Sequence, residues 1–265
     1  MVYGFIGLGN MAKAILGGMR KSAAFAGAEI LGAEPDTVRA AAVSEAYAVC
    51  LASAEEVMAD AETVILAVKP QVLSALLPTL APHVKEGQLV VSIAAGREIS
   101  FYEGVLPKGT PFVRVMPNIN AMVGAAAAAV CGGTYATPAQ VAEVRAVFGT
   151  VGATFEIPED LFSAYTALSG SSPAFVYRYI ETIARAGEAA GFPYETALQI
   201  SCAVALGSAK MAGESGIAPE TLVKMVCSPG GTTIEGVKVL DAEDFSGTVT
   251  RAFDAVVKRD RELRA

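Results

Sequence analysis

The chain has 265 residues and a formal net charge of −7, and 53% of its residues are hydrophobic against 18% charged. It contains no block of like charges, which argues against nucleic acid or an anionic membrane surface as the main partner and favours a small molecule. The apolar fraction exceeds that of an average monomer, so part of the surface is expected to close an interface between subunits.

Cysteine and histidine usage gives no indication of a metal site. The four cysteines form no CxxC pair, and the single histidine, His83, cannot complete a Cys/His site, so no metal is expected. Reduced thiols are typical of the cytosol. The N-terminus lacks a basic segment, and Gly4, Gly7 and Gly9 break its apolar run, so we interpret it as a strand and not a signal peptide. These features predict a cytoplasmic protein.

Short apolar runs alternate with helix-period segments in the first part of the chain. The expected strands are Val2–Ile6, Glu29–Ala33, Thr63–Val68, Leu89–Ile93, Phe112–Val115, Ala125–Cys131 and, at an edge, Gly152–Ile157. The expected helices are Met11–Arg20, Pro35–Ala46, Gln71–Leu80 and Pro138–Phe148. This alternation predicts an α/β domain over residues 1–158, with a Rossmann-like parallel sheet and crossover helices.

Beyond Pro158 the strand pattern stops, and four or five helices are expected to run to the end of the chain. We predict an all-helical domain over residues 159–265. Segments such as Ala197–Met211 are apolar on more than one face, which would leave apolar surface exposed in a monomer. A homodimer or higher homo-oligomer through these C-terminal helices is therefore expected.

The sequence Gly7-Leu8-Gly9-Asn10-Met11-Ala12 directly follows the first expected strand and opens a helix. Gly7 permits a tight turn, Gly9 lets the backbone approach a pyrophosphate, and Ala12 is small enough for the helix to pack on the strand. The helix start, with Asn10 and Met11, presents free N–H groups to the phosphates. The Asn10 side chain either caps the helix or contacts the ligand.

Glu34 stands at the end of the second expected strand, about 22 residues beyond the glycine turn, where the adenosine ribose of a dinucleotide lies. A carboxylate there accepts a hydrogen bond from the ribose 2′-hydroxyl and repels a 2′-phosphate, which favours NADH. Arg39, one helical turn further on, leaves NADPH open. The alternative is that Glu34 is an exposed loop acid. The expected cofactor is NADPH or NADH.

Two further strand ends are candidates to face the nicotinamide, because ligands of open parallel sheets lie beyond the carboxyl ends of the strands. They are Ala67-Val68-Lys69-Pro70 and Val115-Met116-Pro117-Asn118. From these we take Ala67, Lys69, Pro70 and Asn118 as cofactor-binding candidates. Structural alternatives stay open, since a proline also starts the next segment and Lys69 is also explained as a solvated head group.

The stretch 227–235 joins two expected helices through a glycine-rich turn. Adjacent Gly230 and Gly231 leave backbone N–H groups unshielded at a helix N-terminus, beside the hydroxyls of Ser228 and Thr233. This arrangement suits a small carboxylate. A capping box in which Thr232 pairs with Glu235 explains much of the same pattern. A second helix start, Ser171-Ser172-Pro173, either lines the same cleft or is a plain N-cap.

The segment Pro219–Asp241 resembles the signature of the pyrroline-5-carboxylate reductase family at Leu222, Val226, Cys227, Ser228, Gly230, Gly231, Thr233, Gly236, Val237 and Leu240. Other stretches resemble that family in the same order, so that the likeness covers essentially the whole chain: Gly7–Met11, Ala67–Pro70, Val113–Asn118 and Leu168–Ala174. There are two departures. Ile119-Asn120 replaces threonine-proline, and Glu34 stands where the family often has a small or polar residue.

The resemblance implies a Rossmann domain, a helical dimerisation domain and an active site at the junction between subunits. It implies an oxidoreductase acting on CH–NH groups, which reduces 1-pyrroline-5-carboxylate to L-proline with NAD(P)H in the last step of proline biosynthesis. Thr233 would be the catalytic residue that hydrogen-bonds the substrate. Ser228 and the backbone of Gly230, Gly231 and Thr232 would hold the substrate carboxylate.

Two other functions are weighed against this one. A hydroxyacid dehydrogenase of the same plan needs a lysine on the first long helix of the second domain, and 173–190 contains none. A non-catalytic dinucleotide-binding sensor would have no use for the glycine-rich loop at 227–235.

Overall fold

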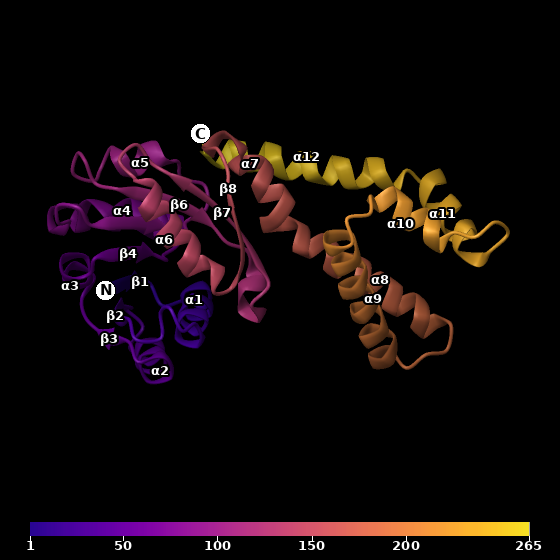
Figure 1. Ribbon diagram of the computed structural model, residues 1–265, viewed down its shortest axis with the longest axis horizontal. Coiled ribbons are helices and arrows are strands. Elements are labelled where there is room, and N and C mark those ends of the chain that lie inside the picture. Colours follow the sequence, from indigo (N-terminus) through magenta and orange to yellow (C-terminus); the bar gives the residue numbers. More distant parts are fainter. Residues whose placement is uncertain (265) are drawn as a thin grey trace. The chain divides into compact units, whose positions relative to one another are not determined.

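The structure is a computed structural model that describes residues 1–264. Its residues form two compact units (Figure 1). The first unit comprises Met1–Gly170 together with the end of the last helix from Val256, and the second comprises Ser171–Ala255. The fold class predicted from the sequence, a Rossmann-like α/β domain followed by a helical domain, is confirmed.

The first unit is built on one sheet whose eight strands, counted within residues 1–264, follow the order β3-β2-β1-β4-β5-β6-β7-β8. The strands are β1 Val2–Ile6, β2 Glu29–Ala33, β3 Cys50–Leu51, β4 Thr63–Leu66, β5 Leu89–Ser92, β6 Phe112–Met116, β7 Ala126–Gly132 and β8 Gly152–Glu156. All neighbours up to β6 pair in parallel, and β8 forms the predicted edge. The carboxyl ends of β1 to β6 therefore share one edge of the sheet.

Strand β7 departs from the parallel arrangement, because it runs antiparallel to β6. The two strands are joined by the short 3₁₀ helix η2, Ile119–Val123, which ends at Gly124 in a left-handed conformation. A parallel connection needs a crossover of a dozen or more residues, so this short turn permits only an antiparallel return. The final strand β8 then pairs in parallel with β7 after a full crossover helix.

Helices cover both faces of the sheet and enclose two apolar cores. The helices are α1 Asn10–Lys21, α2 Thr37–Tyr47, α3 Ala54–Asp60, α4 Pro70–Leu80, α5 Ile99–Glu103 and α6 Pro138–Gly149. Residues of α1, α2 and α6, such as Leu16 and Phe148, pack on one face. Residues of α3, α4 and α5, such as Leu73 and Tyr102, pack on the other. Each fully buried aliphatic side chain stabilises the fold by roughly 1.5–3 kcal/mol.

One strand and two α-helices of this unit were not predicted, namely β3, α3 and α5. Strand β3 has 2 residues and α5 has 5, which is too short for a periodic pattern to stand out. Helix α3 did carry a signal. Ser53 accepts from Glu56 N at 3.1 Å while Ser53 N donates to the Glu56 carboxylate at 2.8 Å, which is a reciprocal capping box.

The second unit is helical, as predicted. Before it lie η3 Glu159–Leu161, α7 Phe162–Tyr165 and a π-helix, η4 Thr166–Ser171. Its helices are α8 Ser172–Ala189, α9 Tyr194–Glu214, α10 Pro219–Val226, α11 Thr232–Ala242 and the first part of α12 Phe245–Arg264. Within residues 1–264, no helix is both long enough and apolar enough for a bilayer crossing.

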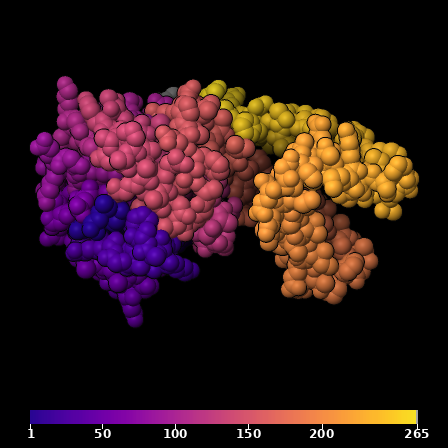
Figure 2. Space-filling model, in the orientation of Figure 1, coloured from indigo at the N-terminus to yellow at the C-terminus, as the bar shows by residue number. Residues whose placement is uncertain are grey.

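The second unit buries few of its own side chains. In α8 the buried residues are Pro173 and Ala184, and in α9 they are Ala197 and Ser201. Leu206 on α9 is 74% exposed and Val226 is 66% exposed. The helices of this unit are drawn in orange and yellow in Figure 2. Such exposed apolar surface agrees with the prediction that these helices carry a subunit contact.

A buried ion pair fastens the segment after β8 to the sheet. Arg114 on β6 is 2% exposed, and its Nη1 lies 2.8 Å from Glu159 Oε1. The guanidinium carbon also lies 4.2 Å from the centre of the Phe162 ring. The same Glu159 oxygen accepts a hydrogen bond from Ile99 N at 2.7 Å. Removing Glu159 would leave the Arg114 charge buried without its partner.

We predict that Glu159→Ala lowers the free energy of unfolding by about 2–3 kcal/mol, because the buried Arg114 loses its counter-charge while Glu159 itself is only partly buried. Urea denaturation at a fixed protein concentration measures this change. The control is Glu156→Ala, since Glu156 lies 3.5 Å from Arg145 in an exposed pair that is expected to contribute little. Equal changes in the two variants would contradict the importance given to the buried pair.

Candidate active site

Two regions of the structure contain the residues that the sequence singled out. One is the edge of the sheet where β1, β2 and β4 end, and the other is the turn between α10 and α11. The first belongs to the sheet unit and the second to the helical unit.

The glycine turn between β1 and α1 has the geometry that a dinucleotide needs. Gly7 has φ +95°, and a Cβ there would lie 2.8 Å from the Ala67 carbonyl oxygen. A Cβ at Gly9 would meet no protein atom within 4 Å. Ala12 is 1% exposed and packs in the core. The turn is thus closed on the Gly7 side and open at Gly9, where a pyrophosphate can approach the backbone.

Asn10 and Met11 begin the helix that follows the turn. Helix α1 starts at Asn10 and its N-cap is Gly9, so the interpretation of Asn10 as the N-cap is wrong. The Asn10 side chain is exposed. Met11 packs against a small cluster containing Ala121 and Val151. Both residues lie in the first turn of a helix, where backbone N–H groups lack intrahelical partners and can donate to an anion.

Glu34 is held firmly at the end of β2. Its side chain is only 5% exposed, so the alternative of an exposed loop acid is wrong. Its Oε2 accepts a hydrogen bond from Leu8 N at 3.0 Å. Its Oε1 accepts from Asp36 N at 3.2 Å and from Arg39 Nη1 at 3.2 Å. The carboxylate therefore ties the end of β2 directly to the glycine turn.

A cavity of about 350 Å³ opens beside this carboxylate. Gly7, Glu34, Ser53 and Val68 are among its lining residues, and most of its wall is aliphatic, contributed by Ile6, Ala33, Ala52, Ala54, Val72 and Leu76. An apolar slot with one carboxylate at its mouth fits an adenosine group, whose flat base is buried while its ribose presents hydroxyls. The sequence analysis did not predict that Ala52, Ser53 and Ala54 line this cavity, although the capping box at Ser53 indicates a helix start there.

The candidates that follow β4 differ in their surroundings: Ala67 lies beside Gly7, whereas Lys69 and Pro70 stand at the start of α4. Ala67 is half-buried beside Gly7, and its N–H donates to Ile6 O at 2.8 Å. Lys69 is exposed and is the N-cap of α4, which Pro70 begins. The proposed helix-starting role of Pro70 is thus observed, which leaves a ligand contact compatible with it. The structure brings Gly7, Glu34 and Ala67 together at one edge.

Asn118 is buried, and its side chain bonds to protein groups. Its Nδ2 lies 3.2 Å from both Ser169 O and Ser169 Oγ, and its Oδ1 accepts from Ala127 N at 3.3 Å. The amide thereby joins the ends of β6 and β7 to the π-helix η4. This connection was not foreseen, because Ser169 is 51 residues away in the sequence. The π-helix also runs without a break into α8, whose N-cap residue is Ser171, and the Ser171 side chain makes no capping hydrogen bond there.

The turn between α10 and α11 has the expected glycine conformation. Gly230 has φ +71°, and Gly231 N donates to Ser228 O at 3.0 Å. Gly231 is the N-cap of α11, and a Cβ there would overlap Ser228 Oγ. Ser228 and Thr233 are exposed in the isolated chain. The turn thus presents hydroxyls and glycine backbone at the start of an 11-residue helix.

The capping box predicted for this turn is wrong. Helix α11 begins at Thr232, one residue earlier than a Thr232 cap requires. Glu235 accepts a bond from Lys238 Nζ at 2.7 Å. Because the cap is a glycine, no side chain of the cap residue occupies the N–H groups of the first turn.

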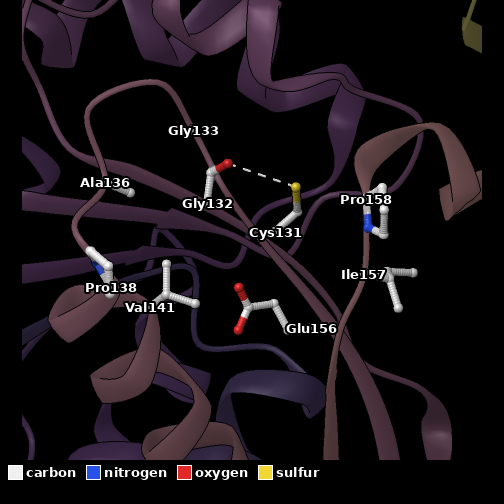
Figure 3. A pocket seen from close by; sticks show the side chains of 9 residues that line it. All are labelled: Cys131, Gly132, Gly133, Ala136, Pro138, Val141, Glu156, Ile157 and Pro158. Carbon is white, nitrogen blue, oxygen red and sulfur yellow. Dashed lines mark hydrogen bonds between the residues drawn. The ribbon is translucent and has the colours of Figure 1, made fainter.

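A second cavity, of about 590 Å³, lies beside the carboxyl ends of β7 and β8 (Figure 3). It contains Cys131, whose thiol donates to Gly132 O at 3.7 Å, and Glu156. Burial raises the pKa of the Cys131 thiol, so it stays neutral and weakly nucleophilic. The described residues 1–264 hold no cluster of histidine, cysteine, aspartate or glutamate able to bind a metal.

A glycine turn, an adenosine-sized slot and a buried carboxylate at the carboxyl edge of a Rossmann sheet define the class of dinucleotide-dependent oxidoreductases. Comparison with known proteins narrows this class. Residues 159–263 match the family model described as pyrroline-5-carboxylate reductase dimerisation, and residues 2–96 match that of NADP oxidoreductase, coenzyme F420-dependent. The chain belongs to the pyrroline-5-carboxylate reductase family.

Relatives across distant organisms support this assignment. The pyrroline-5-carboxylate reductases of Methanosarcina acetivorans and Escherichia coli are each 36% identical, over 98% of this chain and 97% of theirs. The crystal structure of the enzyme from Streptococcus pyogenes is 33% identical with a TM-score of 0.89, over 99% of this chain and 98% of that one. The enzyme from Coxiella burnetii is 30% identical with a TM-score of 0.93 over the same shares.

The two glycines of the turn are expected to respond differently to alanine. Gly7→Ala forces a Cβ against Ala67 at a positive φ, so we predict loss of both thermal stability and dinucleotide binding. Gly9→Ala finds open space in the protein, so we predict an unchanged melting temperature but dinucleotide affinity weakened at least about tenfold. Thermal denaturation and calorimetric titration with NADH measure the two properties. Full affinity in Gly9→Ala would contradict a pyrophosphate at this position.

Proposed function

We propose that this protein reduces 1-pyrroline-5-carboxylate to L-proline with NADPH or NADH, as the last step of proline biosynthesis. The observation that carries the proposal is similarity to named pyrroline-5-carboxylate reductases over 98% of the chain, at 36–38% identity. This similarity spans both the dinucleotide edge and the glycine turn of the helical unit. The four cysteines are free thiols, in keeping with the cytoplasmic location we propose.

The cofactor site uses the residues at the carboxyl edge of the sheet. The open backbone at Gly9, with the first turn of α1 at Asn10 and Met11, binds the pyrophosphate. Glu34 accepts from the adenosine ribose. The nicotinamide half is proposed to lie near Ala67, Lys69, Pro70 and Asn118. Asn118 contributes by fixing the end of β6 through its side-chain hydrogen bonds. The reduced nicotinamide supplies the hydride.

The substrate site uses the turn before α11. The backbone of Gly230, Gly231 and Thr232, with the Ser228 hydroxyl, holds the substrate carboxylate at the positive end of the helix dipole. Thr233 orients the imine by a hydrogen bond. Domain 159–265 carries this turn and the contact between subunits of a homodimer.

The reaction places small demands on acid–base chemistry. A cyclic imine is partly protonated near neutral pH, and its iminium form accepts hydride readily. The single histidine, His83, lies exposed in the 3₁₀ helix η1 Ala81–His83, away from the carboxyl edge of the sheet. The protein therefore acts mainly by binding and orienting the imine carbon at attack distance from the nicotinamide. Helix α8 contains Arg178 and Arg185 but no lysine, which disfavours a hydroxyacid dehydrogenase.

The assay is oxidation of NADH or NADPH, followed by absorbance, with 1-pyrroline-5-carboxylate as substrate. Thr233→Ala is expected to lower kcat/KM about five- to 150-fold, equivalent to roughly 1–3 kcal/mol of lost hydrogen bonding. Thr233→Ser keeps the hydroxyl and is expected to keep most of the activity. A wild-type protein inactive with this imine would contradict the proposed function. Unchanged kinetics in Thr233→Ala would contradict only the role of Thr233.

The helical unit is expected to need a partner. Leu206→Glu places a charge on an apolar residue that is 74% exposed on α9, so we predict dissociation toward monomer. Light scattering coupled to size-exclusion chromatography measures the mass. The matched control is Val38→Glu on α2 of the sheet unit, where the residue is 79% exposed and the mass should not change. An unaltered mass in Leu206→Glu would remove this face of α9 from the subunit contact.

A further inference from the structure

We propose that the buried carboxylate of Glu34 makes this enzyme selective for NADH over NADPH, with Arg39 withheld from the 2′-phosphate by its own ion pairs. The proposal rests on the dinucleotide-dependent function proposed above and specifies which dinucleotide it uses. Family likeness alone leaves this choice open. The argument depends on the contacts of Glu34, Asp36 and Arg39.

The Glu34 carboxylate cannot turn away from the ribose position without cost. It is 5% exposed and lines the adenosine-sized cavity. Its Oε2 holds Leu8 N at 3.0 Å, and its Oε1 holds Asp36 N at 3.2 Å. Rotating the group would leave both backbone N–H groups without these acceptors. A fixed negative charge therefore stands at the mouth of the cavity.

Arg39 is the cation best placed near this carboxylate to meet a 2′-phosphate, and it is already engaged. Its Nη1 lies 3.2 Å from Glu34 Oε1, and its Nη2 lies 3.1 Å from Asp36 Oδ2. Two carboxylates against one guanidinium leave this cluster with a net charge of −1. If Arg39 turned to a phosphate, Glu34 would be left buried and uncompensated beside a group with nearly two negative charges.

A ribose 2′-hydroxyl meets the opposite situation. Each carboxylate oxygen can accept about two hydrogen bonds. Glu34 Oε1 already accepts from Asp36 N and Arg39 Nη1, whereas Oε2 accepts from Leu8 N. Oε2 therefore has capacity to accept from a hydroxyl donor. The same carboxylate thus repels the 2′-phosphate of NADPH and accepts a hydrogen bond from the 2′-hydroxyl that NADH carries in its place.

Binding of each dinucleotide, measured without imine, tests the proposal. The protein has no tryptophan, so isothermal titration calorimetry is preferred to protein fluorescence. The variants are Glu34→Gln, which keeps an acceptor for Leu8 N but removes the charge, and Arg39→Ala. The matched control is Glu29→Gln, an exposed carboxylate at the other end of the same strand.

The wild type is expected to bind NADH at least about tenfold more tightly than NADPH, and Glu34→Gln to reduce this ratio about tenfold or more, chiefly by strengthening NADPH binding. Glu29→Gln should leave the ratio unchanged. A wild type that prefers NADPH, an unchanged ratio in Glu34→Gln, or NADPH binding weakened more than about tenfold by Arg39→Ala would each overturn the proposal. A protein that selects NADH yet reduces no pyrroline-5-carboxylate would refute the proposed reaction alone.

Discussion

The cofactor edge of this protein depends on the close contact between Gly7 and the Ala67 carbonyl. A side chain at Gly7 would collide with that oxygen, so the loops after β1 and β4 can meet only because this residue is glycine. Parallel pairing of β1 with both β2 and β4 brings the three loops to one edge. The hydrogen bond from Leu8 N to Glu34 then fixes the turn from its other side.

The sequence predicted the sheet well and the helix starts poorly. Continuous apolar runs such as β4 are diagnostic because strands buried on both faces tolerate little else. Caps at Asn10 and Thr232 were wrong because a glycine just before each one takes the cap position, and glycine offers no side-chain signal. Long-range contacts were also out of reach. The link between Asn118 and Ser169 depends on tertiary packing and a π-helical turn, which local patterns do not encode.

The two units obtain their stability in different ways. The sheet unit encloses two cores with fully buried residues such as Phe5 and Leu66, so burial within one chain accounts for its order. The helical unit buries few side chains of its own and exposes Leu206 and Val226. A second chain that covered this surface would add to the stability of the unit. The turn at Gly230, which we propose binds the substrate, lies within this second unit.

The contacts of Glu34 also constrain how cofactor choice can change. In a Rossmann site an acidic residue about 20 positions beyond the glycine turn hydrogen-bonds the ribose 2′-hydroxyl. Here the same carboxylate accepts from Leu8 N inside the glycine turn. A small residue at position 34 would remove the charge that opposes a 2′-phosphate, but it would also loosen the glycine turn, where we propose that the pyrophosphate common to both dinucleotides binds. Relaxed selectivity and weaker overall binding are thus linked through one hydrogen bond, unless the replacement keeps an acceptor at that distance.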